Sequence, residues 1–142
     1  MNRGILIVLL SLVATCLMQT AAFADIVIYQ GGSRWAVLED DGDVYIRGSR
    51  VGNIEDDGDV YVSGSREGEI ESDGDIYKRG SRYANVESDG DVYVRGSRRA
   101  QIEDDGDIYI GGSRWGNANS CCSSQWDMAR VIAVIIFFGA PI

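Results

Sequence analysis

The feature that most constrains this chain is a repeat of 16 residues that continues through most of its length without an insertion. Successive units begin at serines, namely Ser33, Ser49, Ser65, Ser81 and Ser97, and a partial unit begins at Ser113. Residues 25–32 read DIVIYQGG, which is the tail of one more unit. A period this regular indicates a chain built from one supersecondary unit whose copies pack on each other.

Each unit contains two turn signals separated by short runs rich in Val, Ile and Tyr. In the unit SRVGNIEDDGDVYVSG, residues 49–64, Asp57-Gly58 predicts a type I′ turn, and the preceding Gly48-Ser49 predicts a type II′ turn. β-Branched and aromatic residues favour strands between these turns. The unit is therefore predicted to be two antiparallel strands, and the whole chain a meander.

The two predicted turns determine which side chains share a face, because side chains alternate along a strand. They place Gly52, Ile54 and Tyr61 on one face, and Val60 and Val62 on the other. We predict the first face to be the interior, because its residues vary least between units, with a small residue opposite each tyrosine. The other face is predicted to meet solvent, and one of its positions is highly variable: Trp35, Val51, Glu67, Tyr83, Arg99 and Trp115.

The predicted fold is all-β: a shallow closed antiparallel barrel of about six 16-residue β-hairpin repeats (25–118), with a C-terminal apolar helix. Closure removes the two exposed edges that an open sheet of this size would have. Six tyrosines at the same position of the repeat and six Gly-Ser-Arg turns favour six-fold over five-fold closure. Strands of five or six residues are shorter than the roughly 9 to 11 that a membrane-spanning barrel requires.

Residues 1–24 have the pattern of a secretory signal peptide. Arg3 precedes an apolar stretch at 5–18, and Ala22-Phe23-Ala24 resembles a cleavage site. The remaining chain is therefore predicted to be exported, to the periplasm, cell envelope or extracellular space of a bacterium. An uncleaved membrane anchor and lipidation at Cys16 are the alternatives.

Composition excludes several classes of function. The chain has no histidine, which removes Ser-His and Cys-His nucleophile pairs and the commonest general base. A net charge of −9 argues against nucleic acid as a partner. We predict a non-catalytic protein without a cofactor. Cys121 and Cys122 are neighbours, and a ring between them, a bond to another chain and lipid attachment all remain open.

The two kinds of turn are predicted to lie at opposite mouths of the barrel, with charged side chains beside each. One set would be a basic ring suited to an anionic ligand or membrane lipid: Arg34, Arg50, Arg66, Arg82, Arg98 and Arg114. Pairing of these arginines with neighbouring acids, with a purely structural role, is the alternative.

The other set would be an acidic ring and a candidate metal site: Asp41, Asp57, Asp73, Asp89 and Asp105. Its constant Asp-Gly-Asp part is shorter than an EF-hand loop, so weak cation binding is favoured over specific calcium sites.

After a polar linker at 119–125, the segment 126–142 is mostly apolar. A helix from 126 to 138 would be about 20 Å long, too short to cross a bilayer unaided. An apolar helix must be buried, in the barrel lumen, a membrane or another copy, and an extra strand is a further alternative. The residues that would form the buried or membrane surface are Trp126, Val131, Ile132, Ile135, Ile136, Phe137 and Phe138.

The pattern D-G-x-V/I-Y…G-x-x-x-G/A-x-I across residues 25–118 resembles the bacterial beta-flower proteins. The resemblance implies a shallow symmetric barrel of repeated hairpins, similar in shape to the tubby C-terminal domain and the phospholipid scramblases. Those barrels surround an apolar C-terminal helix and are linked to membranes. The leading functional prediction is therefore an envelope module that binds membrane lipids or anionic ligands at the arginine ring. The alternative is a scaffold that meets a protein partner through Trp35, Tyr83 and Trp115.

Overall fold

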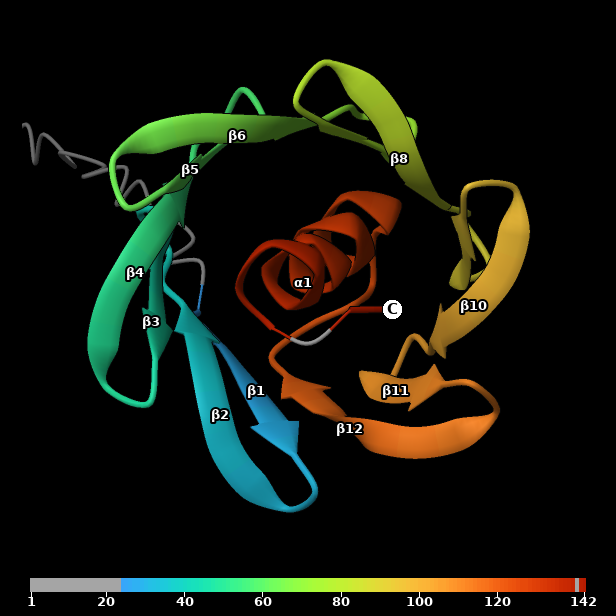
Figure 1. The fold of residues 1–142 in the computed structure, drawn as a ribbon. Helices are drawn as coiled ribbons and strands as arrows, with labels where there is room; N and C mark the ends of the chain where they lie inside the picture. The colour runs from blue at the N-terminus through green and yellow to red at the C-terminus, as the bar shows by residue number, and fades with distance from the viewer. Residues whose placement is uncertain (1–23, 140) are drawn as a thin grey trace, which may run out of the picture.

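The computed structural model describes residues 24–139 and 141–142, and it forms a closed barrel around a helix (Figure 1). Each strand pairs antiparallel with its neighbours in sequence, and the first strand pairs with the last, which closes the ring. The elements are β1 Ile26–Gln30, β2 Ser33–Leu38, β3 Asp43–Ile46, β4 Ser49–Ile54, β5 Asp59–Val62, β6 Ser65–Ile70, β7 Asp75–Lys78, β8 Ser81–Val86, β9 Asp91–Val94, β10 Ser97–Ile102, β11 Asp107–Ile110, β12 Ser113–Asn119 and α1 Gln125–Phe138.

The predicted all-β barrel and its six-fold closure are confirmed. Five repeats are hairpins that are continuous in the sequence. The sixth is the antiparallel pair of β12 and β1, which come from opposite ends of the repeat region. The predicted signal peptide and Cys16 lie outside the described residues, apart from Ala24.

The acidic turn has one more residue than predicted. Glu55 N–H donates to Asp59 O at 2.9 Å, and Gly58 N–H donates to Glu55 O at 3.0 Å. The loop is therefore Asp56, Asp57 and Gly58, with φ of +96° at Gly58, and Ile54 lies opposite Val60. The predicted type I′ turn at Asp57-Gly58 is wrong. A loop of this length, with glycine in the left-handed region, is the other common hairpin solution.

The other turn is displaced by one residue. Arg47 and Gly48 are its central residues, with φ of +49° and +86°, and Ile46 lies opposite Ser49. Positive φ at both positions defines a type I′ turn, so the predicted type II′ turn at Gly48-Ser49 is wrong. A β-bulge follows: Tyr45 pairs with Arg50 and Val44 pairs with Gly52, which leaves Val51 as the extra residue.

These two corrections reverse part of the predicted interior, because a register shift of one residue moves side chains to the opposite face. Gly52 and Ile54 are buried as predicted, but Val60, predicted to meet solvent, is also buried. Tyr61 lies on the outer wall opposite Arg66. The interior is therefore lined by aliphatic side chains, and the predicted tyrosine lining and the small residue opposite each tyrosine are wrong.

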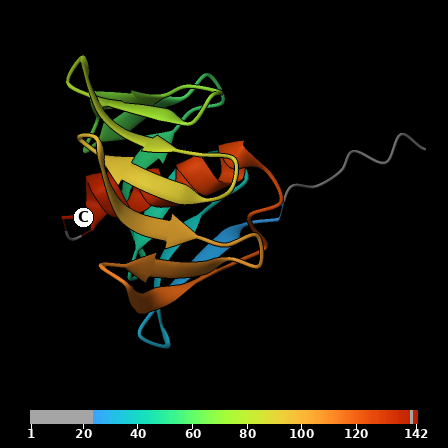
Figure 2. The ribbon, with the colours of Figure 1, turned by 90° about the vertical axis from the view of Figure 1, so that its right-hand side faces the viewer.

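The C-terminal segment is a helix in the lumen of the barrel (Figures 1 and 2). Ser124 caps it by accepting a hydrogen bond from Asp127 N–H at 3.1 Å. Residues 131–136 are buried on every side, and a Cβ on Gly52 would lie 2.7 Å from the Phe138 ring. Small residues in the wall thus make room for the helix, as an apolar helix requires. Of the alternatives for this segment, lumen burial is correct and an extra strand is wrong.

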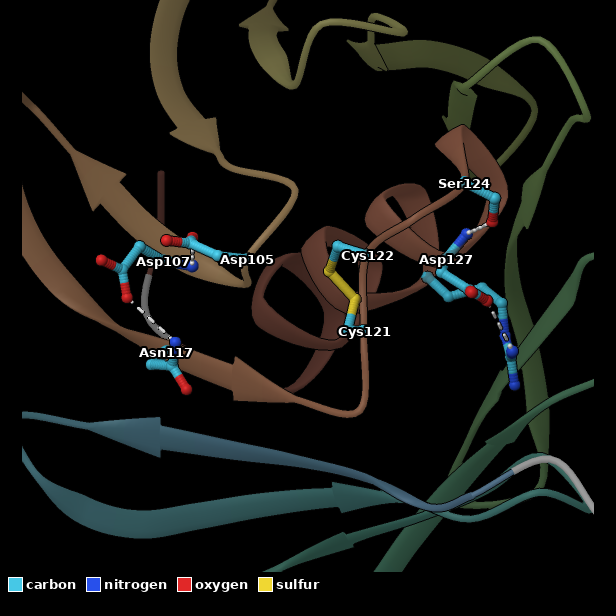
Figure 3. Close-up of a disulfide and its surroundings, with 8 residues drawn as sticks. Asp105, Asp107, Asn117, Cys121, Cys122, Ser124 and Asp127 are labelled. Atoms are coloured by element: carbon cyan, nitrogen blue, oxygen red, sulfur yellow. Dashed lines mark hydrogen bonds and ion pairs between the residues drawn. A yellow bond between two sulfur atoms is a disulfide. The ribbon is translucent and has the colours of Figure 1, made fainter.

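The link between β12 and α1 contains a disulfide between Cys121 and Cys122 (Figure 3). Of the three states that the sequence left open, the structure has the ring between neighbours. Cys122 is buried and packs with the core. Within the described part of the chain no polar or charged side chain is buried, so the disulfide ring and the helix complete a core without polar side chains.

Candidate functional site

The two mouths of the barrel carry different chemistry. The acidic turns (40–42, 56–58, 72–74, 88–90 and 104–106) surround the start of α1, where Gln125 Nε2 donates to Asp73 O and Val86 O, both at 2.8 Å. The variable turns (31–32, 47–48, 63–64, 79–80, 95–96 and 111–112) surround its end, where a Cβ on Gly139 would lie 3.0 Å from Trp35. Figure 2 shows the helix passing from one mouth to the other. We name them the acidic mouth and the aromatic mouth.

The predicted basic ring does not form. Five of its arginines lie on the outer wall, and each pairs with the aspartate that begins the preceding strand: Arg50–Asp43 at 2.6 Å, Arg66–Asp59 at 2.7 Å, Arg82–Asp75 at 2.8 Å, Arg98–Asp91 at 2.7 Å and Arg114–Asp107 at 2.9 Å. The hydrogen bond from Arg50 lowers the pKa of Asp43 below its usual range. These five arginines therefore pair with neighbouring acids, which was the alternative to a basic ring. Arg34 differs, because Val27 stands where its aspartate would be.

The predicted acidic ring does form, and each of its aspartates belongs to a trio of carboxylates. Asp57, for example, lies between Glu55 and Asp59, with ligand oxygens within 4.8 Å of one another. The same trio surrounds Asp41, Asp73, Asp89 and Asp105. In each, the central aspartate accepts a backbone N–H two residues later, at 3.0 Å for Asp57. These carboxylates thus stabilise the turn, and cation binding stays a prediction.

Carboxylate crowding changes the titration of the acidic mouth. Burial of the carboxyl group raises the pKa of Glu71, and the negative charges of Asp73, Glu69 and Asp75 raise it further. The pKa of Glu39 is raised for the same reasons. In the trios around Asp41 and Asp73 the ionised form of the glutamate is therefore disfavoured, while the third carboxylate of each trio, Asp43 or Asp75, is paired with an arginine on the outer wall.

The aromatic mouth combines apolar and cationic side chains. Phe137, Phe138 and Trp115 are half-buried against the core, at the end of the helix. Lys78 Nζ lies 5.2 Å from the ring centre of Tyr83 and 5.9 Å from that of Phe137. These contacts are within the range of cation–π interactions.

Further cations extend this surface. Arg95 also contacts Tyr83, with its guanidinium carbon 5.5 Å from the ring centre. Arg99 is exposed on the next hairpin. An acid, Glu67, lies on the same rim and is neutralised by Arg79 at 2.9 Å. One sector of the mouth is therefore basic and aromatic together.

The expectation that Trp35 is exposed on the outer face is wrong, and a protein partner at Trp35, Tyr83 and Trp115 stays a prediction. Trp35 is only 7% exposed and packs edge-to-face with Trp115, at 5.5 Å between ring centres. Tyr83 and Trp115 are half-buried at the rim. The same repeat position is exposed in Arg99 and half-buried in Val51 and Glu67, so its environment differs from unit to unit.

The predicted apolar segment is divided between three environments. Val131, Ile132, Ile135 and Ile136 are buried in the lumen. Phe137 and Phe138 reach the aromatic mouth, and Trp126 lies half-buried beside Asp56 and Asp73 at the acidic mouth. The described residues contain no helix with the length and hydropathy that a membrane span requires.

Sequence reasoning missed Lys78, Arg95 and Arg99 because it looked for residues that recur in every unit. The signal that could have found them is variation, because each occupies a position whose residue changes from unit to unit.

The protein is a closed barrel of hairpin repeats with an apolar helix in its lumen. Comparisons with protein-family models, curated proteins and solved structures found no match. Function is therefore argued from the surface chemistry.

Proposed function

We propose that the protein is a non-catalytic module that docks on an anionic membrane surface through its aromatic mouth. The observation that carries the proposal is the juxtaposition of half-buried Phe137, Phe138 and Trp115 with Lys78 and Arg95. Aromatic side chains settle at the level of lipid headgroups, and nearby cations are attracted to anionic lipids. Each cation close to such a surface contributes about 1 kcal/mol at moderate salt.

The charge distribution supports one orientation of docking. Arg79, Arg95 and Arg99 are exposed on the aromatic side of the barrel. The carboxylate trios lie at the opposite mouth. An anionic surface attracts the first mouth and repels the second, so the barrel axis would stand upright on the membrane. The net charge of −9 then favours solubility without preventing binding.

This proposal revises the leading prediction from the sequence. The lipid-facing residues become Lys78, Arg95 and Arg99 in place of the five arginines that are paired on the outer wall. We extend the proposal to export from the cell and to kinship with the beta-flower proteins, whose repeat pattern the chain resembles. An exported barrel of this kind would meet the outer surface of a membrane rather than cross it.

Flotation of residues 25–142 on lipid vesicles tests the proposal. We expect flotation with phosphatidylglycerol-rich vesicles, little with neutral phosphatidylcholine, and weaker binding at high salt. The double variant Lys78→Gln/Arg95→Gln should lose most of the bound fraction. The double variant Ser72→Asp/Ser88→Asp is the matched control, because it adds the same net charge at the acidic mouth, where other units already have Asp56 and Asp104. Equal flotation of both variants would contradict the proposal.

A further inference from the structure

The sixth outer-wall position lacks the ion pair that the other five contain. Arg34 occupies the same place in the repeat as Arg50, opposite Tyr29 as Arg50 is opposite Tyr45. The residue equivalent to Asp43 is Val27. Among the described residues no carboxylate forms a salt bridge with Arg34, whereas the other five guanidiniums lie 2.6 to 2.9 Å from an aspartate oxygen. Comparison with the other units thus shows that Arg34 lacks a carboxylate partner.

A hollow of about 410 Å³ lies beside Arg34 on the outer wall, between β2 and β3. Val37 and Tyr45 form part of its lining. Val37 is only 8% exposed although it belongs to the outer face. The equivalent residues of the other units are polar: Asn53, Glu69, Asn85, Gln101 and Asn117. This hollow therefore has an apolar floor that its counterparts lack.

The charges around the hollow are arranged along its length. Arg34 and Arg47 lie toward the aromatic mouth, and Asp25 and Glu39 lie toward the acidic mouth. Within the described residues Arg47 also has no carboxylate partner, whereas the equivalent Arg79 pairs with Glu67 at 2.9 Å. An anion in the hollow would therefore be drawn toward the two arginines and away from the acids.

We propose that this hollow binds small organic monocarboxylates with an apolar body. The ligand carboxylate accepts hydrogen bonds from Arg34 in the way that Asp43 accepts from Arg50, and the apolar body lies on Val37 and Tyr45. Uncharged analogues gain the apolar contact without the ion pair, so the site discriminates by charge. The lining of this hollow includes none of the five residues that carry the membrane-docking proposal, and the binding of a carboxylate does not depend on that proposal.

Binding of benzoate, followed by ¹H–¹⁵N NMR titration of residues 25–142, tests the proposal. Benzamide serves as the uncharged ligand of the same shape. We expect saturable shifts at Arg34, Val37 and Tyr45 with benzoate, and binding weaker by about tenfold with benzamide, in line with the loss of one charge-assisted hydrogen-bonded contact. Val27→Asp supplies the missing carboxylate from the protein, so it should also weaken benzoate binding by about tenfold. Val27→Asn introduces a side chain of the same shape as aspartate but without its charge, so this variant should bind benzoate as the original chain does.

Arg34→Gln provides an independent check at an exposed position, and it should remove benzoate binding while the remaining spectrum stays unchanged. Three results would overturn the proposal. One is the absence of saturable shifts with benzoate in the original chain. Another is equal binding of benzoate and benzamide. The third is benzoate binding by Val27→Asp that is within twofold of that by Val27→Asn.

Discussion

The two mouths of the barrel are built from the same repeat, yet one is almost invariant and the other varies between units. At the acidic mouth, each consecutive unit has the same glycine and the same carboxylate trio. At the aromatic mouth, the equivalent positions hold Glu67, Tyr83, Arg99 and others. The regular mouth follows from the geometry that every hairpin needs. At the aromatic mouth the side chains are specific to each unit. Both surfaces that we propose to bind ligands consist of residues that differ from the equivalent residues of the other units.

The largest expected difference between the mouths concerns their glycines. A Cβ on Gly58, in an acidic turn, would overlap with the carbonyl oxygen of Ile70, whereas a Cβ on Gly64, in a variable turn, would meet nothing within 4 Å. Both have positive φ. We expect Gly64→Ala to lower the free energy of unfolding by about 1 kcal/mol through backbone strain alone, and Gly58→Ala by about 3 kcal/mol or more, because the clash adds to the strain.

Urea denaturation of the two variants measures this difference directly. Gly64→Ala is the control for the cost of positive φ. Equal destabilisation by the two substitutions would mean that the acidic turn is no more constrained than the variable turn, and the comparison between the mouths would fail.

The pH dependence of stability should separate the outer wall from the acidic mouth. Arg50, Arg66 and Arg114 lower the pKa values of their aspartate partners, so these pairs stabilise the fold above the unfolded pKa of about 4. Their contribution is lost as the pH falls through the lower folded values. The raised pKa values of Glu39 and Glu71 act in the opposite sense. Protonation relieves the cost of burying a charged carboxylate and the repulsion from its neighbours, so stability rises as the pH falls toward about 4.

The two effects together predict a maximum of stability at about pH 4 to 5. Denaturation measured from pH 7 to pH 2.5 checks this expectation. Replacing Glu71 by Gln should flatten the rise between pH 7 and pH 4.5 and leave the acid limb in place. A stability that only falls as the pH is lowered from 7 would show that crowding at the acidic mouth is negligible.

The smallest expected effect is that of calcium. Because the central aspartate of each trio already accepts a hydrogen bond from the turn, we expect millimolar calcium and magnesium to raise the melting temperature equally and by little. Thermal unfolding with each cation, at matched ionic strength, measures the difference. A rise specific to calcium, lost in Asp57→Asn, would instead make the trios true calcium sites.

Much of the fold could be predicted from the sequence, because the repeat length, the glycines and the β-branched residues all point to closed hairpins. Which side chains face the interior could not be predicted, because the sequence Glu-Asp-Asp-Gly-Asp permits a loop of two or of three residues. That difference in loop length decides whether Tyr61 or Val60 is buried. The bulge at Val51 carries no separate signal in the sequence. Lumen burial of α1 was among the predictions, but the choice depended on tertiary packing against Gly52 and Gly68.

The candidate surface was harder to predict than the fold. Arg50 and its equivalents recur in register with aspartates seven residues earlier, a spacing that becomes an ion pair only once the strands are paired. The cations of the aromatic mouth have no such regularity, and Lys78 meets Phe137 only because the helix ends at that mouth. Long-range proximity of this kind is set by closure of the barrel and by the helix inside it.

The most direct test of membrane docking uses the tryptophans at the two mouths. Trp115 lies at the aromatic mouth and Trp126 at the acidic mouth. Chains with one tryptophan each, Trp35→Phe/Trp126→Phe and Trp35→Phe/Trp115→Phe, would be bound to anionic vesicles that contain brominated lipid. The account predicts strong quenching of Trp115 fluorescence and none of Trp126. Equal quenching of both, or quenching of Trp126 alone, would contradict it.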